Sequence, residues 1–364
     1  MKRQIIVRSA LGIAVAISAG VLMLSGCNSG GSDQKVTRLS GGGATFVQPL
    51  IDEWKQPLHQ ATGIELDYQA KGSGNGLQQM TKKTIDFGCS DAPMKKAQLE
   101  EAIKEGGEVI HIPLTMGPVV PAYNVPGIDK PLVFSGPVLA DIYLGKIKKW
   151  NDEAIRKLNQ DARLPDMNIL AVYRAEASGT TNIFTEYLSK VSPEFKFRVG
   201  ASTQPKWPSG VGTGERENSG VAAAVKSNAG AIGYVEVRHA KKNGLQYGAV
   251  INKAGKPVLG SSETVTAAAA SALQEKQTAE PYSLHELTYS ITDASGENAY
   301  PISGLSYCVI YKKQPAQVGK TLKEFLDWAI HAGQTFAVGL DYAPLPKELV
   351  KQIEAKLQQI ELIP

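Results

Sequence analysis

Hydrophobic residues alternate between a helical period and a strand period along most of the chain, which predicts strands joined by helices in an α/β fold. Over residues 46–58 the apolar positions fall on one helical face, and Gly63 is expected to end that helix. Residues 64–68 then alternate between apolar and polar, as in a half-buried strand. The same periods predict further strands at 85–89, 169–173, 231–237 and 307–311, and further helices around 77–80 and at 183–188, 265–274, 322–332 and 347–357.

The first thirty residues have a different pattern, with three cations, no acid, a long apolar stretch, and small residues just before Cys27. This order is typical of a secretory signal peptide, and the last four residues of the segment resemble the lipobox of bacterial lipoproteins, whose cysteine carries the lipid. We expect residues 1–26 to be removed and residues 27–35 to form a flexible, lipid-anchored tether. The alternative is an uncleaved membrane anchor, because the apolar stretch is close to spanning length.

The composition is that of a folded protein, with 43% hydrophobic and 20% charged residues in 364, a length that favours two domains. The formal net charge of +4 falls to +1 when Lys2, Arg3 and Arg8 leave with the signal peptide. Binding of nucleic acid through bulk charge is therefore not supported.

Two cysteines remain beyond Cys27, and both lie in apolar, strand-like runs. An oxidising compartment permits a disulfide between Cys89 and Cys308, but two separately buried thiols are the simpler interpretation. The five histidines are scattered without metal-ligand spacing, so neither a metal site nor a cofactor is expected.

Three turns rich in Gly, Ser and Thr precede predicted helix starts, at residues 41–46 (GGGATF), 72–76 (GSGNG) and 178–180 (SGT). Free N–H groups at a helix N-terminus bind anions, and glycine lets the backbone approach a ligand. Each turn alone is better explained as ordinary helix capping, and none is a phosphate-binding P-loop or a dinucleotide fingerprint. Three of them in one chain favour an anion site.

Two charged residues at strand ends indicate what such a site would select. Arg174 ends a predicted strand, where its guanidinium can bind an oxyanion, unless it only forms a surface ion pair with Glu176. Asp91 follows another strand, and it either caps a helix or acts as a proton detector. A carboxylate only accepts hydrogen bonds, so it suits hydrogen phosphate and disfavours fully ionised sulfate.

These residues lie in segments that resemble the phosphate-binding (PstS) component of the phosphate-specific ABC transporter. The matching segments are SGGGATFVQPL, DFGCSDAPM, DIYLGKIKKWND, RAEASGTTNIFTEYL, WPSGVGTG, GAIGYVE and FLDWA, and the match covers nearly the whole mature chain. The resemblance implies a type II-like periplasmic-binding-protein fold with mixed sheets, helices on their faces and the ligand in a cleft between two lobes. Lobe I would combine residues 36–116 and 301–364, and lobe II would span residues 117–300.

The same resemblance implies that eight residues bind phosphate. They are Thr45, Phe46, Ser73, Asp91, Arg174, Ser178, Gly179 and Thr180. The family commonly has Asp-Gly where this chain has Glu176-Ala177, so the aspartate that orients the arginine is replaced by a longer acid, and we expect weaker binding. The implied partners are inorganic phosphate, permease and ATP-binding subunits of an importer, and the membrane through lipid on Cys27, on the periplasmic side of the cell envelope.

Three alternatives stay open. A receptor for another oxyanion such as sulfate is disfavoured by Asp91. A secreted hydrolase with Ser178 as nucleophile is disfavoured because residues 176–180 are not GxSxG and no histidine partner is indicated nearby. A surface adhesion or signalling protein has no specific feature in its favour. We therefore expect a phosphate-binding receptor without catalytic activity.

Overall fold

The structure is a computed structural model that describes residues 37–275, 281–283 and 286–364. The predicted signal peptide (1–26), Cys27 and the tether (27–35) lie outside the described residues. Within the described part, no helix is long and apolar enough to cross a membrane.

Nine strands form one mixed sheet, in the order β2-β1-β3-β12-β4-β8-β6-β7 with β9 beside β4. Their bounds are β1 Thr37–Gly43, β2 Ile64–Gln69, β3 Phe87–Ser90, β4 Val109–Tyr123, β6 Leu170–Arg174, β7 Gly212–Glu215, β8 Ala231–Glu236, β9 Gln246–Tyr247 and β12 Ser303–Tyr311. Smaller sheets pair β5 (Val133–Phe134), β10 (Ala249–Ile251) and β11 (Pro257–Val258), and β13 (Lys313–Pro315) with β14 (Glu361–Ile363).

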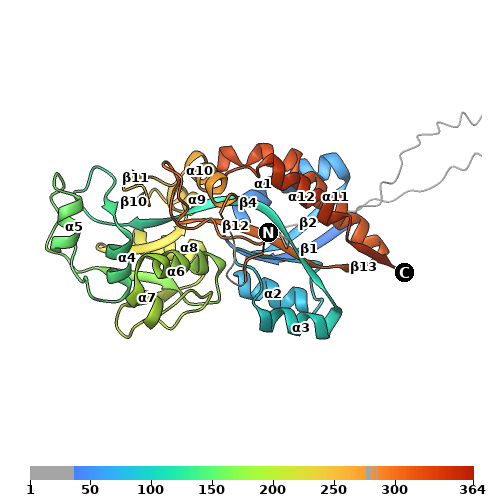
Figure 1. Cartoon of the computed structure of the whole chain (residues 1–364), viewed down its shortest axis with the longest axis horizontal. Helices are drawn as coiled ribbons and strands as arrows, with labels where there is room; N and C mark the ends of the chain where they lie inside the picture. Colours follow the sequence, from blue (N-terminus) through green and yellow to red (C-terminus); the bar gives the residue numbers. More distant parts are fainter. Residues whose placement is uncertain (1–36, 276–280, 284–285) are drawn as a thin grey trace, which may run out of the picture. The chain divides into compact units, whose positions relative to one another are not determined.

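The long strand β4 connects the two halves of this sheet (Figure 1). Its residues 109–118 pair antiparallel with β12, and its residues 119–123 pair antiparallel with β8. On either side the strands are parallel, β1 with β2 and β3, and β6 with β7 and β8. The outer strands are therefore parallel and the centre is antiparallel, which makes the sheet mixed, as the resemblance implies.

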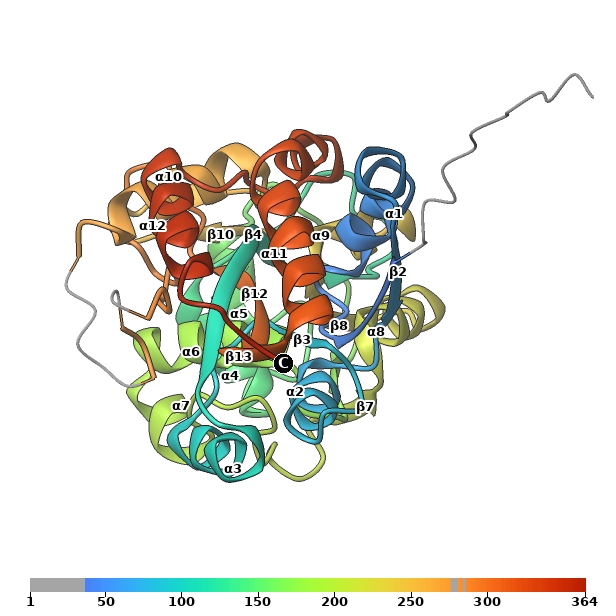
Figure 2. The same cartoon turned by 90° about the vertical axis from the view of Figure 1, so that its right-hand side faces the viewer.

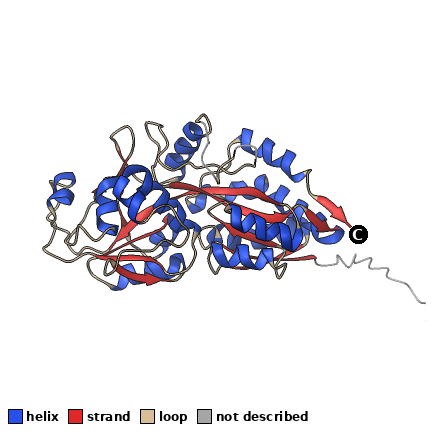
Figure 3. Ribbon diagram, turned by 60° about the horizontal axis from the view of Figure 1, so that its bottom comes forward, coloured by secondary structure: helices blue, strands red, loops and turns tan. Residues whose placement is uncertain are grey.

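Helices pack on both faces of the strands (Figure 3). Their bounds are α1 Gln48–Thr62, α2 Ser73–Thr81, α3 Lys96–Gly106, α4 Gly136–Tyr143, α5 Glu153–Leu158, α6 Gly179–Val191, α7 Pro193–Arg198, α8 Glu217–Ser227, α9 Val237–Lys242, α10 Ser262–Ala272, α11 Ala316–Ile330 and α12 Lys347–Leu357, with 3-10 turns at Ala332–Phe336 and Val338–Leu340. The N-terminal α1 and the C-terminal α12 both pack against α11 (Figure 2). Gly63 ends α1 as predicted, in the left-handed conformation at φ 75°.

Two groups of buried aromatic rings hold the two halves of the sheet. In the first, Phe87 of β3 stacks with Tyr68 of β2 at 6.2 Å between ring centroids and packs against Phe325 of α11 at 5.4 Å. In the second, Phe184 of α6 stacks on Tyr234 of β8 at 4.4 Å. Each ring is close to fully buried, so each group contributes several kcal/mol of hydrophobic stabilisation.

These contacts fix the carboxyl ends of two sets of parallel strands, β1–β3 and β6–β8. Residues 36–364 form one compact unit. The predicted lobe boundaries at residues 116 and 300 stay predictions.

Candidate functional site

All eight predicted ligand residues are buried and lie at or just beyond the carboxyl ends of strands. Thr45 and Phe46 follow β1, Ser73 follows β2, Asp91 follows β3, and Arg174, Ser178, Gly179 and Thr180 end or follow β6. In open α/β sheets this is the edge at which ligands bind.

Hydrogen bonds join the residues from the two sets of strands. The Ser73 hydroxyl oxygen accepts the backbone N–H of Gly179 at 3.0 Å and that of Asp91 at 3.4 Å. The Thr180 hydroxyl donates to Oδ2 of Asp91 at 3.3 Å. Ser73 and Gly179 are 106 positions apart in sequence. Segments that are far apart in the sequence therefore meet at one place.

Glycine permits this close approach at two positions. A Cβ on Gly179 would lie 2.5 Å from the backbone nitrogen of Asp91, and a Cβ on Gly74 would lie 2.5 Å from the Cβ of Ala177. Such distances do not occur between non-bonded atoms, so any larger residue would separate the two segments. The glycines therefore allow backbone to pack on backbone at this site.

Helix α6 begins in the centre of the site. The Ser178 hydroxyl oxygen accepts the backbone N–H of Thr181 at 3.2 Å, so Ser178 is the N-cap of this thirteen-residue helix. Capping uses a lone pair of the hydroxyl and leaves its proton free to be donated. Capping and anion binding are therefore compatible roles for Ser178.

Asp91 is the one predicted ligand residue with a negative charge. Its Oδ1 accepts a hydrogen bond from the hydroxyl of Ser306 at 2.8 Å, and its Oδ2 accepts the bond from Thr180. Burial raises the pKa of Asp91 to about 7, although the bond from Ser306 and the charge of Arg174 oppose the rise. The carboxyl group can therefore hold or release a proton near neutral pH.

Arg174 forms the ion pair with Glu176 that the sequence offered as an alternative to anion binding. Its Nε and Nη2 both donate to Oε1 of Glu176, at 2.9 Å for Nε, and the arginine side chain is 1% exposed. Burial raises the pKa of Glu176, but the hydrogen bond and charge of Arg174 outweigh burial and lower it.

The ion pair does not saturate either partner. Nη1 of Arg174 is buried without a hydrogen-bond partner among the described residues. A buried guanidinium nitrogen without a partner is costly in isolation, so this donor fits an anionic ligand.

The structure adds Asn218, a residue that the sequence reasoning missed. Asn218 is fully buried near the start of α8, and its side-chain Nδ2 donates to the hydroxyl oxygens of Thr45 at 2.9 Å and Thr180 at 3.2 Å. A signal was present, because residues 212–218 repeat the arrangement of a strand, a short turn and a helix start seen in the three predicted turns.

Thr45 and Phe46 are held through their backbone as well. Nε2 of His239 lies 3.0 Å from the carbonyl oxygen of Thr45, and the Tyr342 hydroxyl donates to the carbonyl of Phe46 at 2.6 Å. Burial lowers the pKa of His239 to about 4, so the ring is neutral and we assign its proton to Nε2. Neither His239 nor Ser306 carried a recognisable sequence signal.

Cys89 and Cys308 are free, buried thiols. They lie directly opposite each other on β3 and β12. Both thiols are buried as expected, but they are cross-strand neighbours and are not buried separately.

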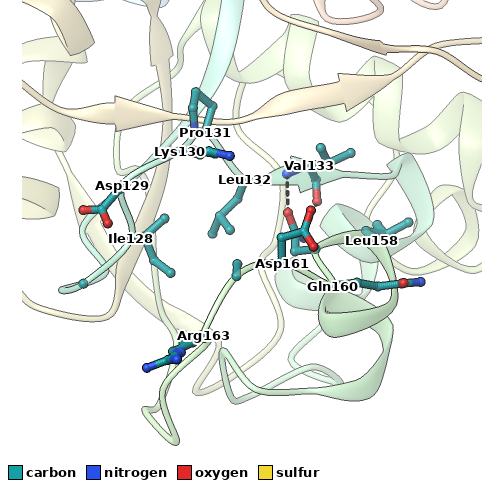
Figure 4. Close-up of a pocket in the computed structure, with 13 residues that line it drawn as sticks. Ile128, Asp129, Lys130, Pro131, Leu132, Val133, Leu158, Gln160, Asp161 and Arg163 are labelled. Carbon is teal, nitrogen blue, oxygen red and sulfur yellow. Dashed lines mark hydrogen bonds between the residues drawn. The ribbon is translucent and has the colours of Figure 1, made fainter.

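Other features of the described residues lie apart from this site. A hollow of about 620 Å³ is formed by residues 127–133 and 158–163 (Figure 4). Two of its lining residues, Val133 and Asn159, form two hydrogen bonds with each other. None of the eight predicted ligand residues lines it. Among the described residues, no group of three or more His, Cys, Asp or Glu could hold a metal ion.

Comparison with known proteins decides the family. Residues 28–332 match the model of the PBP superfamily domain. The phosphate-binding protein PstS of Pasteurella multocida is 42% identical over 320 residues, which cover 87% of this chain and 89% of that protein. The chain belongs to the PstS family of phosphate-binding proteins.

Solved structures show that the fold is that of other phosphate-binding proteins. A high-affinity periplasmic phosphate-binding protein, PfluDING, bound with phosphate, superposes with a TM-score of 0.69 at 18% identity and covers 90% of this chain and 100% of its own. An ABC-type phosphate transport receptor from Vibrio cholerae gives a TM-score of 0.54 at 15% identity, with 85% and 100% coverage. The predicted fold class, an α/β periplasmic-binding-protein fold with mixed sheets and flanking helices, is confirmed for this PstS-family member.

Proposed function

We propose that this PstS-family protein is a receptor that binds inorganic phosphate and delivers it to an ABC-type import permease. One observation carries the proposal. The buried carboxyl group of Asp91 accepts a hydrogen bond from Thr180 at the start of α6 and is influenced by the charge of Arg174 at the end of β6. The PstS relative and the phosphate-bound fold neighbour support the same ligand.

The chemistry of the donors fits hydrogen phosphate. Arg174 would supply positive charge, and the hydroxyls of Thr45, Ser73 and Ser178 would each donate one proton to a phosphate oxygen. Asp91 would accept the proton that phosphate still carries. Sulfate has no such proton at neutral pH, so it would leave the carboxylate unpaired and repelled.

We assign the remaining ligand positions in the same way. Phe46, Gly179 and Thr180 would donate backbone N–H groups, while the Thr180 hydroxyl keeps its bond to Asp91. Gly179 would exchange its bond to Ser73 for one to the ligand. The bond from Gly179 to the ligand would be stronger than the bond to Ser73 that it replaces, because its acceptor would be charged.

The ligand residues divide between the two predicted lobes. Thr45, Phe46, Ser73 and Asp91 belong to lobe I (36–116 plus 301–364), and the other four belong to lobe II (117–300). We infer that phosphate binds in the cleft between the lobes and stabilises the closed form. Such closure requires that phosphate bind the closed form more tightly than the open form.

We propose that the protein is exported and acts on the periplasmic side of the cell envelope. Residues 1–26 would be its signal peptide, and lipid on Cys27 would anchor it to the membrane. Its protein partners would be the transmembrane and ATP-binding subunits of the importer. It would not be an enzyme, because a receptor releases its ligand unchanged. Hydrolysis of an ester that is lost in Ser178→Ala would contradict this part.

The direct test is equilibrium dialysis of residues 28–364 against labelled phosphate, comparing Arg174→Lys with wild type. Lysine keeps the charge but loses the fork of donors, so we expect the dissociation constant for phosphate to increase by at least about tenfold. Arg163→Lys is the matched control, since Arg163 is exposed and lines the separate hollow of Figure 4. A wild-type protein that binds no phosphate would contradict the proposed function.

A further inference from the structure

Asn218 is not one of the eight predicted ligand residues, but its side chain forms hydrogen bonds to two of them, Thr45 and Thr180. It lies near the start of α8, just beyond the carboxyl end of β7, and it is 0% exposed. Its backbone N–H and its Nδ2 both donate to the hydroxyl oxygen of Thr45, at 3.2 and 2.9 Å. The two residues are 173 positions apart, and they belong to different predicted lobes.

The orientation of the Asn218 amide is fixed from behind. Its Oδ1 accepts the backbone N–H of Glu236 at 3.0 Å. An amide turned by 180° would place two donors against each other at Glu236, and an oxygen between the two threonine hydroxyls. The backbone of β8 therefore decides that the Nδ2 group faces the site.

This orientation determines where the hydroxyl protons point. A hydroxyl has one donor and two acceptor positions, and Asn218 occupies both acceptor positions of Thr45. The Thr45 proton can therefore only be donated elsewhere. The Thr180 hydroxyl accepts a hydrogen bond from Nδ2 at 3.2 Å and donates to Asp91, so its proton points toward the Asp91 carboxyl group.

The main chain of Thr45 is held by a neighbouring element. His239 of α9 contacts the Thr45 carbonyl oxygen at 3.0 Å. With the carbonyl and the hydroxyl both held, Thr45 has little freedom to turn its proton away. Free rotation of a hydroxyl would otherwise have to be restricted when ligand binds, which costs affinity.

We propose that Asn218 is a positioning residue that determines in which direction the hydroxyl protons of the site point. It holds the Thr45 hydroxyl as a donor to the anion, and it does so only when the segment of β7 and α8 lies against the segment of β1. Closing the site and orienting its donors are then one event. The proposal rests on the proposed function, because it assumes that the anion is phosphate.

The test measures phosphate affinity by calorimetry for Asn218→Ala and Asn218→Asp in residues 28–364. Removal of the amide frees the Thr45 hydroxyl to rotate and removes a contact between the segments, so we expect about 10- to 100-fold weaker binding. The carboxylate introduced by Asn218→Asp could only accept, so it would draw the Thr45 proton away and repel the anion. We expect at least about 100-fold weaker binding at pH 8, where the new carboxyl is ionised.

A pH series separates positioning from a merely structural role. The ratio of the wild-type and Asn218→Asp affinities should shrink as the pH falls from 8 to 5, because the new carboxyl becomes protonated and regains a donor. A loss caused by poor folding would not follow the protonation of that group. Asn228→Asp is the matched control, since it adds the same charge at the exposed end of the same helix.

A double-mutant cycle with Thr45→Val tests whether Asn218 acts through Thr45. Valine has the shape of threonine without the hydroxyl, so the loss from Asn218→Ala should be clearly smaller in the Thr45→Val background. If Asn218→Asp does not fold, Asn218→Ser replaces it, because its short hydroxyl cannot reach both threonines.

The outcomes are distinguishable. Wild-type affinity in the Asn218 variants, with weaker binding by Thr45→Val, would overturn the inference and leave the proposed function in place. Additive losses in the cycle would overturn the action through Thr45. A wild-type protein that ignores phosphate would overturn the proposed function and this inference with it.

Discussion

The hydroxyl of Ser306 donates a 2.8 Å hydrogen bond to Oδ1 of Asp91, although 215 positions separate the two residues. The bond exists because β12 pairs antiparallel with β3, which places Tyr307 opposite Ser90 and Ser306 beside Asp91. A C-terminal strand thus holds the carboxyl group that would select the ligand.

This bond lowers the pKa of Asp91 against the effect of burial. In Ser306→Ala we therefore expect the pKa of Asp91 to rise above its wild-type value of about 7. The measurement is the carboxyl carbon chemical shift of Asp91 against pH in phosphate-free protein. An unchanged titration would show that Ser306 does not stabilise the ionised carboxyl.

Asp91→Asn should relax the discrimination against sulfate. An amide can donate to a sulfate oxygen and carries no charge, so the repulsion that disfavours sulfate disappears. We expect the ratio of phosphate to sulfate affinity to fall by at least about tenfold, measured by competition. A ratio equal to that of wild type would refute the role of Asp91 as a proton detector.

The same variant should alter how stability depends on pH. In the folded, ligand-free protein the pKa of Asp91 is raised to about 7 from 3.8. Below pH 4 the Asp91 carboxyl is protonated in the folded and in the unfolded state, so it does not change the free energy of unfolding. From pH 4 to 7 it ionises more readily in the unfolded state, so its contribution lowers the free energy of unfolding as the pH rises. Asp91→Asn should therefore gain stability over wild type as the pH rises through this window. Thermal unfolding in phosphate-free buffer at pH 4, 6 and 8 would show this, and a constant difference would count against it.

Glu176→Ala should destabilise the protein by about 3 kcal/mol, because it leaves the buried guanidinium of Arg174 without its partner. The control is Glu194→Ala, which breaks an exposed pair with Lys146 and should destabilise the protein much less. Urea unfolding of both variants gives the comparison. Equal losses would mean that the Arg174 pair behaves like a surface ion pair.

Cys89 and Cys308 should react with iodoacetamide only after unfolding. Both are fully buried, and burial raises the pKa of both thiols, so the reactive thiolate is scarce in the folded protein. Mass spectrometry of residues 28–364 should show two added groups in denaturant without reductant and none before. A failure to label in denaturant unless reductant is added would reveal a disulfide.

Local patterns predicted the outer elements well. Residues 347–357 form α12 at the predicted bounds, and Gly63 ends α1, because amphipathic spacing and a left-handed glycine act within a few residues. The helix predicted over residues 322–332 corresponds to α11, which begins six residues earlier at Ala316. The early start is not visible in the apolar spacing.

The long central strand β4 was not predicted from periodicity. β4 contains Pro113, Pro118 and Pro121, which argue against a strand, yet it runs through the middle of the sheet. Pairing with β12 on one part and β8 on the next overrides the local preference. The carboxyl-end turns were recognisable as candidate sites, whereas Ser306 and His239 reach the site only through long-range pairing and packing.

This protein would act as a phosphate receptor in which the carboxyl group of Asp91 detects the proton of the ligand. The most direct measurement is calorimetry on residues 28–364, stripped of phosphate and titrated with phosphate and then with sulfate at one pH. We expect tight one-to-one binding of phosphate and no response to sulfate. Equal binding of both anions would contradict the role of Asp91, and binding of neither would contradict the receptor itself.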